Sequence, residues 1–301
     1  MIQHLYLGRV AYDEGLRLQE EMVALRAAGR IENVLLLLEH PPVLTLGRNA
    51  TRENILVSDE LLAERGVTVH EINRGGDVTY HGPGQLVGYP IFDLRSLRNA
   101  AGGRLGPVDF VRRMEEALIR LCGVYGVRAG RIAGLTGVWC TAYGGLLEES
   151  AAHGALLEQG GGDKDGRKIG AIGIHVSRGI TSHGFAFNVT TDLRDFQLIN
   201  PCGITDRPVT SLAREVADAA VLPSLEAIAG EAARQFGHVF GEPVVAVESV
   251  DALRAQARSV AVEGPADHEV VEEQGMAEDT PLRVPREVER LHDAREHPIR
   301  A

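Results

Sequence analysis

The chain is poor in the features that mark several large classes of protein. Its three cysteines, Cys122, Cys140 and Cys202, are an odd number and form no C-x-x-C pair. This argues against both a disulfide framework and a zinc knuckle. No apolar run approaches the ~20 residues of a membrane span, because Glu39 ends the run that begins at Val34. A reducing compartment and no membrane association are therefore expected.

An excess of basic charge is also missing. The formal net charge is −11 at pH 7, which argues against non-specific binding to nucleic acid. The first residues show neither a basic segment nor an apolar one after it, so we expect no secretory signal and a cytoplasmic protein. Residues 246–301 carry 13 Asp and Glu against 7 Arg and contain no aromatic residue. They are predicted to form an acidic tail outside the folded domain, either disordered or loosely helical.

The remaining residues, 1–245, show the periodic patterns of a folded domain. Amphipathic spacing predicts helices over 11–28, 58–65, 107–122 and 224–239. Short apolar runs predict strands at 34–38, 43–46, 67–72, 85–92, 136–140, 168–176 and 181–189. Helices and strands do not alternate strictly, which favours an α/β domain of the α+β type on a mixed sheet. Residues 141–166 hold seven glycines and are predicted to be a loop insertion.

Cys202 is the first candidate for chemistry. It lies in the sequence Asn200-Pro201-Cys202-Gly203, which is typical of a turn. A lone cysteine is most often a small buried hydrophobe, and this is our interpretation of Cys122 and Cys140. For Cys202 the turn leaves two possibilities open, a buried side chain or a nucleophile.

Lys168 is the second candidate, because it begins an otherwise apolar strand. An ammonium beside a cysteine lowers the pKa of the thiol below its free value of about 8.5 and so populates the nucleophilic thiolate. A lysine deprotonated in a partly buried site can instead act as a base. A third possibility is a strand-end lysine whose amine simply reaches solvent.

The glycine-rich segment 74–85 is the third candidate. Its glycines can expose successive backbone N–H groups, which suit a phosphate or a developing oxyanion. No Gly-Lys-Ser/Thr follows, so it is not a Walker A loop. His81 within it can be a base, a hydrogen-bond donor or a structural residue. The other histidines show no metal-ligand spacing, so no metal is expected.

These segments together resemble a known family. Residues 74–90, Arg-Gly-Gly-Asp-Val-Thr-Tyr-His-Gly-Pro-Gly-Gln-Leu-Val-Gly-Tyr-Pro, are similar to the signature of the bacterial octanoyltransferases, the lipoate-protein ligase B family. Residues 39–48, 168–173 and 201–204 agree with three further family blocks in the same order. The resemblance covers roughly residues 1–240.

The resemblance implies a fold and a reaction. The fold would be that of the biotin and lipoate protein ligases, a single domain with a larger mixed sheet and a smaller sheet flanked by helices. Cys202 would form an acyl thioester and Lys168 would lower the pKa of its thiol. The implied substrate-binding residues are Arg74, Gly75, Gly76, Asp77, Val78, Thr79, Tyr80, His81, Ala171, Ile172, Gly173, Gly184, Phe185 and Ala186.

It also implies the partners. Octanoyl-acyl carrier protein would donate the acyl group, and a lysine of a lipoyl domain would accept it, in the E2 subunits of 2-oxoacid dehydrogenases or the H protein of glycine cleavage. Neither ATP nor a metal would be needed, and the chain would act as a monomer. The chain departs from the family in the 141–166 insertion, in its extension beyond 240 and at His175, where a basic residue such as arginine is expected.

Three other functions are alternatives to octanoyl transfer, and they differ in how they would use Cys202 and Lys168. An ATP-dependent lipoate ligase would have no use for Cys202. A non-catalytic acyl-binding protein would need neither Cys202 nor Lys168. A hydrolase of acyl thioesters would use both, and differs only in passing the acyl group to water.

Overall fold

Two sheets organise the chain, and the computed structural model describes them over residues 1–99, 102–140, 166–200 and 207–263. In these residues the larger sheet has eight strands in the order β11-β1-β2-β6-β10-β9-β8-β7. The bounds are β11 Val244–Ala246, β1 Ile2–Arg9, β2 Asn33–Glu39, β6 Gln85–Ile91, β10 Ile180–Asn188, β9 Arg167–Ser177, β8 Leu135–Cys140 and β7 Ala129–Ile132. β1 runs parallel to β11 and β2, and the other neighbours are antiparallel, so the sheet is mixed.

The smaller sheet has three strands in the described part of the chain, in the order β4-β3-β5. Its strands are β4 Thr68–Glu71, β3 Val43–Leu46 and β5 Val78–His81. β3 lies in the middle, parallel to β4 and antiparallel to β5. The prediction of a mixed larger sheet and a smaller sheet is confirmed.

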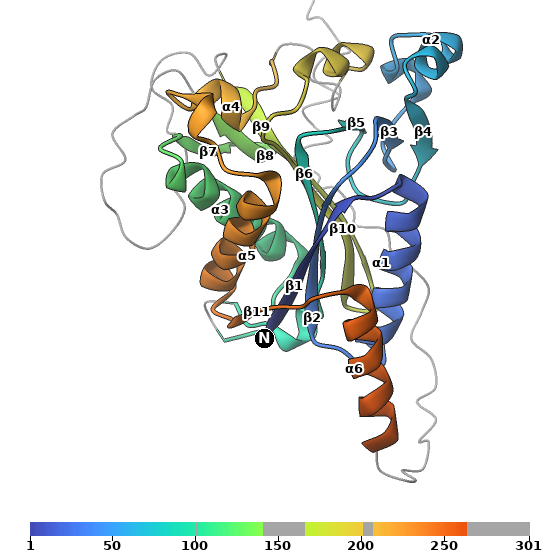
Figure 1. Cartoon of the computed structure of the whole chain (residues 1–301), viewed down its shortest axis with the longest axis vertical. Helices are drawn as coiled ribbons and strands as arrows, with labels where there is room; N and C mark the ends of the chain where they lie inside the picture. The colour runs from blue at the N-terminus through green and yellow to red at the C-terminus, as the bar shows by residue number, and fades with distance from the viewer. Residues whose placement is uncertain (100–101, 141–165, 201–206, 264–301) are drawn as a thin grey trace, which may run out of the picture. The chain divides into compact units, whose positions relative to one another are not determined.

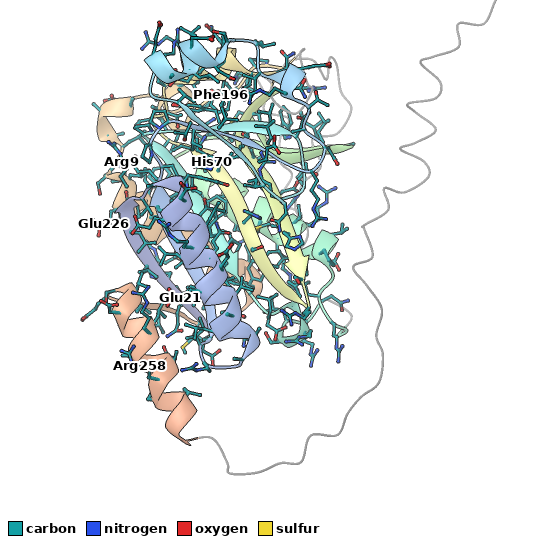
Figure 2. The ribbon with its side chains drawn as sticks, turned by 90° about the vertical axis from the view of Figure 1, so that its right-hand side faces the viewer. Arg9, Glu21, His70, Phe196, Glu226 and Arg258 are labelled. Carbon is teal, nitrogen blue, oxygen red and sulfur yellow. The ribbon has the colours of Figure 1, made fainter. Side chains whose placement is uncertain are left out.

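Helices cover both faces of the larger sheet (Figure 1). The α-helices are α1 Tyr12–Ala27, α2 Asp59–Glu64, α3 Pro107–Val124, α4 Leu212–Glu215, α5 Leu225–Phe240 and α6 Val250–Glu263. Short 3-10 turns span Arg52–Asn54, Leu94–Ser96, Leu193–Leu198 and Ala219–Val221. α3 and α5 pack on one face, and α1 and α6 lie on the other, where Figure 2 labels Glu21 on α1 and Arg258 on α6.

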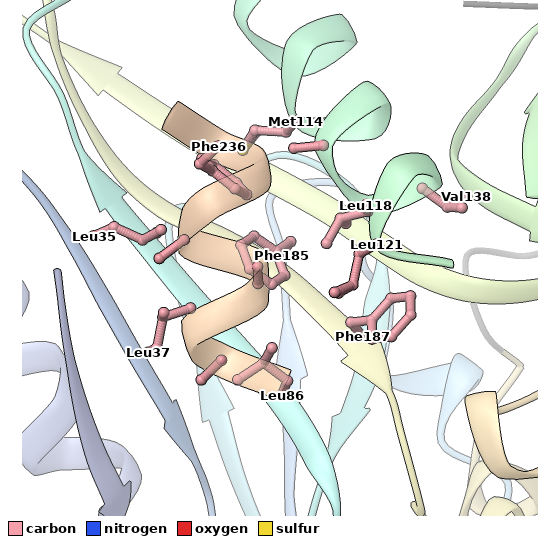
Figure 3. Packing of buried hydrophobic residues seen from close by; sticks show 14 of the residues in the cluster. Leu35, Leu37, Leu86, Met114, Leu118, Leu121, Val138, Phe185, Phe187 and Phe236 are labelled. Carbon is pink, nitrogen blue, oxygen red and sulfur yellow. The ribbon is translucent and has the colours of Figure 1, made fainter. Parts of the chain in front are cut away.

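The strand β2 shows why the sheet is buried on both sides. Successive side chains of a strand point to opposite faces, and a strand covered on both faces is apolar throughout. Leu35 and Leu37 pack with Phe236 and the helices α3 and α5 (Figure 3). Leu36 and Leu38 pack on the other face with residues of α1 and α6. Each buried leucine stabilises the fold by about 1.5–3 kcal/mol.

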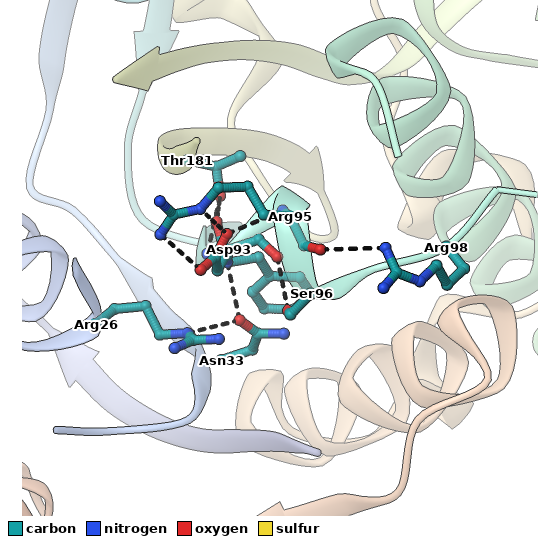
Figure 4. A network of polar contacts seen from close by, with 8 residues as sticks. Arg26, Asn33, Asp93, Arg95, Ser96, Arg98 and Thr181 are labelled. Carbon is teal, nitrogen blue, oxygen red and sulfur yellow. Dashed lines mark hydrogen bonds and ion pairs between the residues drawn. The ribbon is translucent and has the colours of Figure 1, made fainter. Parts of the chain in front are cut away.

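Polar contacts join α1, β2, β6, β10 and the Leu94–Ser96 turn at the end of the larger sheet where β2 begins (Figure 4). The Asp93 carboxylate caps the 3-10 turn by accepting from the Arg95 amide at 2.9 Å, and it forms an ion pair with the Arg95 side chain. Asn33 Oδ1 accepts from the Asp93 amide and from Arg26 Nε of α1, each at 2.9 Å. Thr181 Oγ1 donates to the carbonyl of Pro90 at 2.6 Å.

The ordered domain continues past residue 245, where the sequence predicted a disordered tail to begin. β11 pairs with β1, and α6 buries Leu253 and Ala257 against the core. Arg254 of α6 forms an ion pair with Glu21 of α1 at 2.7 Å. The buried face of α6 is narrow, so the acidic composition of the segment concealed it. Residues 264–301 and the predicted insertion up to 165 lie outside the described residues.

Candidate active site

A cavity of about 310 Å³ lies between the larger and the smaller sheet. β6, β9 and β10 contribute residues from the larger sheet, and β5 contributes residues from the smaller one. The lining residues are Tyr12, Asn49, Arg74, Gly76, Asp77, Thr79, His81, Val87, Tyr89, Gly134, Leu135, Thr136, Lys168, Ala171, Ile172, Gly173, His183, Gly184, Phe185 and Ala186. Most of the residues that the sequence singled out for substrate binding therefore meet at one cavity, together with Lys168.

Three of the predicted binding residues do not line this cavity. Val78 and Tyr80 alternate along β5 with the cavity residues Thr79 and His81, so their side chains point to the opposite face. They are buried in the core of the smaller sheet, where Tyr80 Oη donates to Asp195 at 2.7 Å. Gly75 instead donates its amide to Ile174 of β9.

The glycine-rich segment is more regular than the sequence indicated. Residues 78–81 form the strand β5, and Gly76 has a φ of +90° in the turn before it. The segment was expected to present a row of free N–H groups to a ligand. However, the amides of Gly75, Val78, Gly84 and Gln85 donate to groups within the chain. The short strand escaped notice because glycine and proline on either side favoured a loop.

Arg74 brings a buried positive charge to the cavity, since its side chain is only 8% exposed. Arg74 Nη2 donates to the Thr45 carbonyl at 2.8 Å and to Thr45 Oγ1 at 2.9 Å. Arg74 Nη1 donates to the Gly75 carbonyl at 3.0 Å. This charge is one of the causes that lower the pKa of His81 and of His183.

His81 is held by a chain of buried hydrogen bonds. Gln85 Nε2 donates to the Tyr80 carbonyl at 3.1 Å and to Asn188 Oδ1 at 2.9 Å, so Gln85 Oε1 is the acceptor for His81 Nδ1 at 2.8 Å. Burial lowers the pKa of His81 to about 3. A neutral imidazole with so low a pKa is a weak base near pH 7. The geometry therefore favours an orienting role for His81 over base catalysis.

The structure adds two histidines to which the sequence assigned no role. His40 Nδ1 lies 2.7 Å from the Val10 carbonyl and donates to it, so His40 Nε2 accepts from the Tyr89 hydroxyl at 2.6 Å. His183 Nε2 lies 2.8 Å from Asn73 Oδ1. Burial lowers the pKa of each imidazole to about 4. The position of His40 within the block 39–48 was the available signal.

Lys168 lines the cavity from the second position of β9, near the strand end where the sequence predicted it. Its amide donates to Pro208 and its carbonyl accepts from Thr210, both at 2.9 Å. The sequence held a further signal, because only two of its 31 basic residues, Lys164 and Lys168, are lysines.

Cys202 lies outside the described residues, but both flanks of its segment are described. On one side the Asn200 amide donates to the Asn54 carbonyl at 2.8 Å. On the other side Pro208 and Thr210 hydrogen-bond to the backbone of Lys168, and the Thr210 carbonyl accepts from Asn188 Nδ2 at 2.9 Å.

Neither a metal cluster nor a membrane-spanning helix is found in the part of the chain that the structure describes. Among these residues, no group of three or more His, Cys, Asp or Glu side chains could hold a metal ion. None of the described helices combines the length and the apolar character needed to cross a membrane.

Comparisons with known proteins agree with this fold. Residues 11–234 match the lipoyl protein ligase A/B catalytic domain. The octanoyltransferase of Acidobacterium capsulatum is 60% identical over 246 residues, which are 81% of this chain and 92% of that protein. The octanoyltransferase of Koribacter versatilis is 46% identical over 293 residues, or 97% and 98% of the two chains.

Solved structures show the same fold at low sequence identity. A bipartite lipoate protein ligase from Thermoplasma acidophilum, studied with its E2 lipoyl domain, has a TM-score of 0.58 and 15% identity, covering 87% of this chain and 91% of that one. Lipoate-protein ligase A bound with ATP has a TM-score of 0.53 and 16% identity, covering 87% and 94%. The predicted likeness to lipoate protein ligases is confirmed.

The fold and the family match define the class of protein first. The chain belongs to the lipoyl protein ligase A/B catalytic domain family. Within that family it belongs to the octanoyltransferases, as its relatives at 46–60% identity show, and it is an acyltransferase. The resemblance stated from the sequence is thereby confirmed.

Proposed function

We propose that this enzyme transfers an octanoyl group from octanoyl-acyl carrier protein to the lysine of a lipoyl domain, through a thioester on Cys202. Lys168 would stabilise the Cys202 thiolate. The observation that carries the proposal is the position of Lys168. It lines the cavity and is bonded through its backbone to Pro208 and Thr210, which follow Cys202 closely in the sequence.

In the first step the Cys202 thiolate attacks the carbonyl carbon of the donor thioester. The carbon–sulfur bond to the carrier protein breaks, and its thiolate leaves and takes up a proton. One thioester replaces another, so the step is nearly isoenergetic and needs no ATP. The ammonium of Lys168 favours the attacking thiolate over the thiol.

In the second step the neutral amine of the lipoyl-domain lysine attacks the Cys202 thioester. An amide bond forms, the bond to Cys202 sulfur breaks, and the amine gives up one proton. The Cys202 sulfur is the leaving group, and the proton released by the amine is taken up by this sulfur or by solvent. An amide is more stable than a thioester, so this step drives the transfer forward.

The cavity suits an acyl chain on one wall and a carbonyl at its polar end. Val87, Ala171, Ile172, Phe185 and Ala186 supply apolar surface. Burial contributes about 0.8 kcal/mol for each methylene. The length of the cavity can therefore distinguish an octanoyl chain from shorter ones.

The acceptors proposed are the lipoyl domains of 2-oxoacid dehydrogenase E2 subunits and the H protein of glycine cleavage. An E2 lipoyl domain accompanies the Thermoplasma ligase that shares this fold. We place the reaction in the cytoplasm, where the Cys202 thiol would stay reduced.

Intact-protein mass spectrometry tests the proposal. The wild type is mixed with octanoyl-acyl carrier protein, and an unmodified lipoyl domain is then added. We expect a gain of one octanoyl group that the lipoyl domain removes and that Cys202→Ser does not show. Cys122→Ser is the matched control, because Cys122 is fully buried and lies away from the cavity, and it should label like the wild type.

Two results would contradict the proposal. Equal labelling of wild type and Cys202→Ser would exclude Cys202 as the nucleophile. A labelled wild type that loses its acyl group to water, with no transfer to the lipoyl domain, would make the protein a hydrolase.

A further inference from the structure

The strand β8 is shaped to approach Lys168 closely. Gly137 has a φ of +124°, and its amide donates to the buried carboxylate of Glu115 at 3.0 Å. The pairing of β8 with β9 shifts register just after it, between Val138 and Trp139, as at a β-bulge. A Cβ atom at Gly137 would lie 2.6 Å from the Gly170 carbonyl and 3.0 Å from Lys168 Cε. Glycine is therefore required for this approach.

The bulge sets Trp139 directly opposite Lys168. Directly opposed residues of two paired strands lie on the same face of the sheet. The Lys168 ammonium nitrogen lies 4.9 Å from the centroid of the Trp139 ring. This is within the ~6 Å at which a cation is attracted to an aromatic face. The ring is 1% exposed, so water does not weaken the attraction.

A second cation uses the same ring. Arg207 Cζ lies 5.8 Å from the Trp139 centroid. Arg207 is the first described residue after the segment that contains Cys202. Trp139 thus contacts the proposed activating lysine and the residue that ends the proposed nucleophile segment.

We propose that Trp139 is a positioning residue for acyl transfer, whose indole face holds the Lys168 ammonium at the cavity. Lysine has a flexible four-carbon side chain, and a fixed ammonium acts on a thiolate more strongly than a mobile one. This inference rests on the proposed role of Lys168 in activating Cys202. Trp139 itself would touch neither the acyl group nor the reacting atoms.

The sequence gives two means of testing this position alone. Lys164 and Lys168 are the only lysines, so Lys164 is an internal reference for any amine-specific reaction. Trp139 is the only tryptophan, so growth on fluorinated tryptophan changes the ring electronics at this one site. Fluorination keeps the shape of the ring and weakens its attraction for a cation.

The first experiment measures reductive methylation of the two lysines in the full-length protein by peptide mass spectrometry. Trp139→Met removes the aromatic ring, and Trp139→Phe keeps one. We expect the ratio of Lys168 to Lys164 labelling to change about fivefold in Trp139→Met. Trp139→Phe should stay close to wild type, and the fluorinated protein should lie between them.

The second experiment follows the rate of Cys202 acylation against pH in a single turnover. With the ammonium displaced, the midpoint of the rate should rise by about one pH unit in Trp139→Met. The plateau at high pH should stay near wild type, because the thiolate is fully formed there. A merely structural role would lower the plateau and the melting temperature without moving the midpoint.

The outcomes separate this inference from the proposed function. An unchanged labelling ratio in both Trp139→Met and the fluorinated protein overturns the positioning role, whatever the enzyme catalyses. A changed ratio with an unmoved acylation midpoint also overturns it, because Lys168 would then not act through its position. Absence of acylation in the wild type would contradict the proposed function, while the labelling ratio still tests the contact. If Trp139→Met does not fold, the fluorinated protein decides.

Discussion

The two ends of the larger sheet use polar groups in opposite ways. At the end where β2 begins, Asp93 and Arg95 are paired to each other and cap a turn, with Arg95 about half exposed. At the cavity, Arg74, His81 and His183 are buried, and so is His40, whose ring centroid lies 6.0 Å from that of His81. Burial lowers the pKa of all three histidines. The first arrangement stabilises the fold, whereas the second costs stability when a proton is added. Buried polar groups that are costly to charge are therefore concentrated where chemistry is proposed.

The largest expected effect is the loss of acyl transfer when Lys168 at the cavity is replaced. Lys168→Met should lower the rate of acyl transfer by about 10²–10⁴-fold, because the thiolate would lose its ammonium partner. Lys168→Arg should not restore the rate, since a planar guanidinium is bulkier than an ammonium and cannot occupy the same position beside the thiolate. Single-turnover acylation and thermal unfolding are measured together. A Lys168→Met enzyme with wild-type turnover would remove Lys168 from the mechanism.

The second prediction concerns the dependence of stability on pH. The pKa of His40 and of His183 is lowered to about 4 and that of His81 to about 3, from 6.5. Between these values the unfolded chain binds more protons than the folded one, so stability is fully present above pH 6.5 and is lost as pH falls towards 4. Each histidine contributes a slope of up to about 1.4 kcal/mol per pH unit.

Urea unfolding between pH 5 and 7 measures this slope. His40→Gln should reduce the slope of stability against pH by up to about 1.4 kcal/mol per pH unit, because one buried imidazole is removed. The other two histidines should keep the rest. A slope that is the same in wild type and in His40→Gln would show that the buried His40 does not resist protonation.

The third prediction tests the end of the domain. Truncation after residue 245 removes α6 with the buried Leu253 and Ala257 and uncovers part of the core on that face. It should lower the free energy of unfolding by about 3 kcal/mol. Truncation after Glu263 keeps α6 and is the matched control, which should melt like the full chain. Equal melting of both truncations would return the domain boundary to residue 245.

The smallest effect is expected at the other end of the sheet. Asp93→Ala removes the cap of the Leu94–Ser96 turn and should cost about 1 kcal/mol, with acyl transfer unchanged. Arg95→Ala keeps the cap and should cost less, because an exposed ion pair contributes little. Chemical unfolding and single-turnover rates check both variants. Loss of activity in Asp93→Ala would show that the two ends of the sheet are coupled.

Sequence patterns predicted the elements with strong apolar periodicity well, and missed elements whose pattern is short or weak. The helix Pro107–Val124 and the strand Asn33–Glu39 carry strong periodic or continuous apolar patterns, and both are confirmed. β1, β5, β7 and β11 were missed. β5 and β7 have four residues each, and β5 pairs with β3, which lies more than thirty residues earlier in the chain. For such strands the partner decides the structure more than local propensity does.

The candidate active site was likewise predictable from the sequence only in part. The sequence by itself determined which residue types were available, namely Cys202 in an Asn-Pro-Cys-Gly segment, a rare lysine and a glycine-rich block shared with the octanoyltransferases. Only the tertiary structure decided that Thr79 and His81 face the cavity while Val78 and Tyr80 face the core. It alone placed Trp139 against Lys168. These relations depend on strand register and on a bulge, and register is fixed by pairing between segments far apart in the chain.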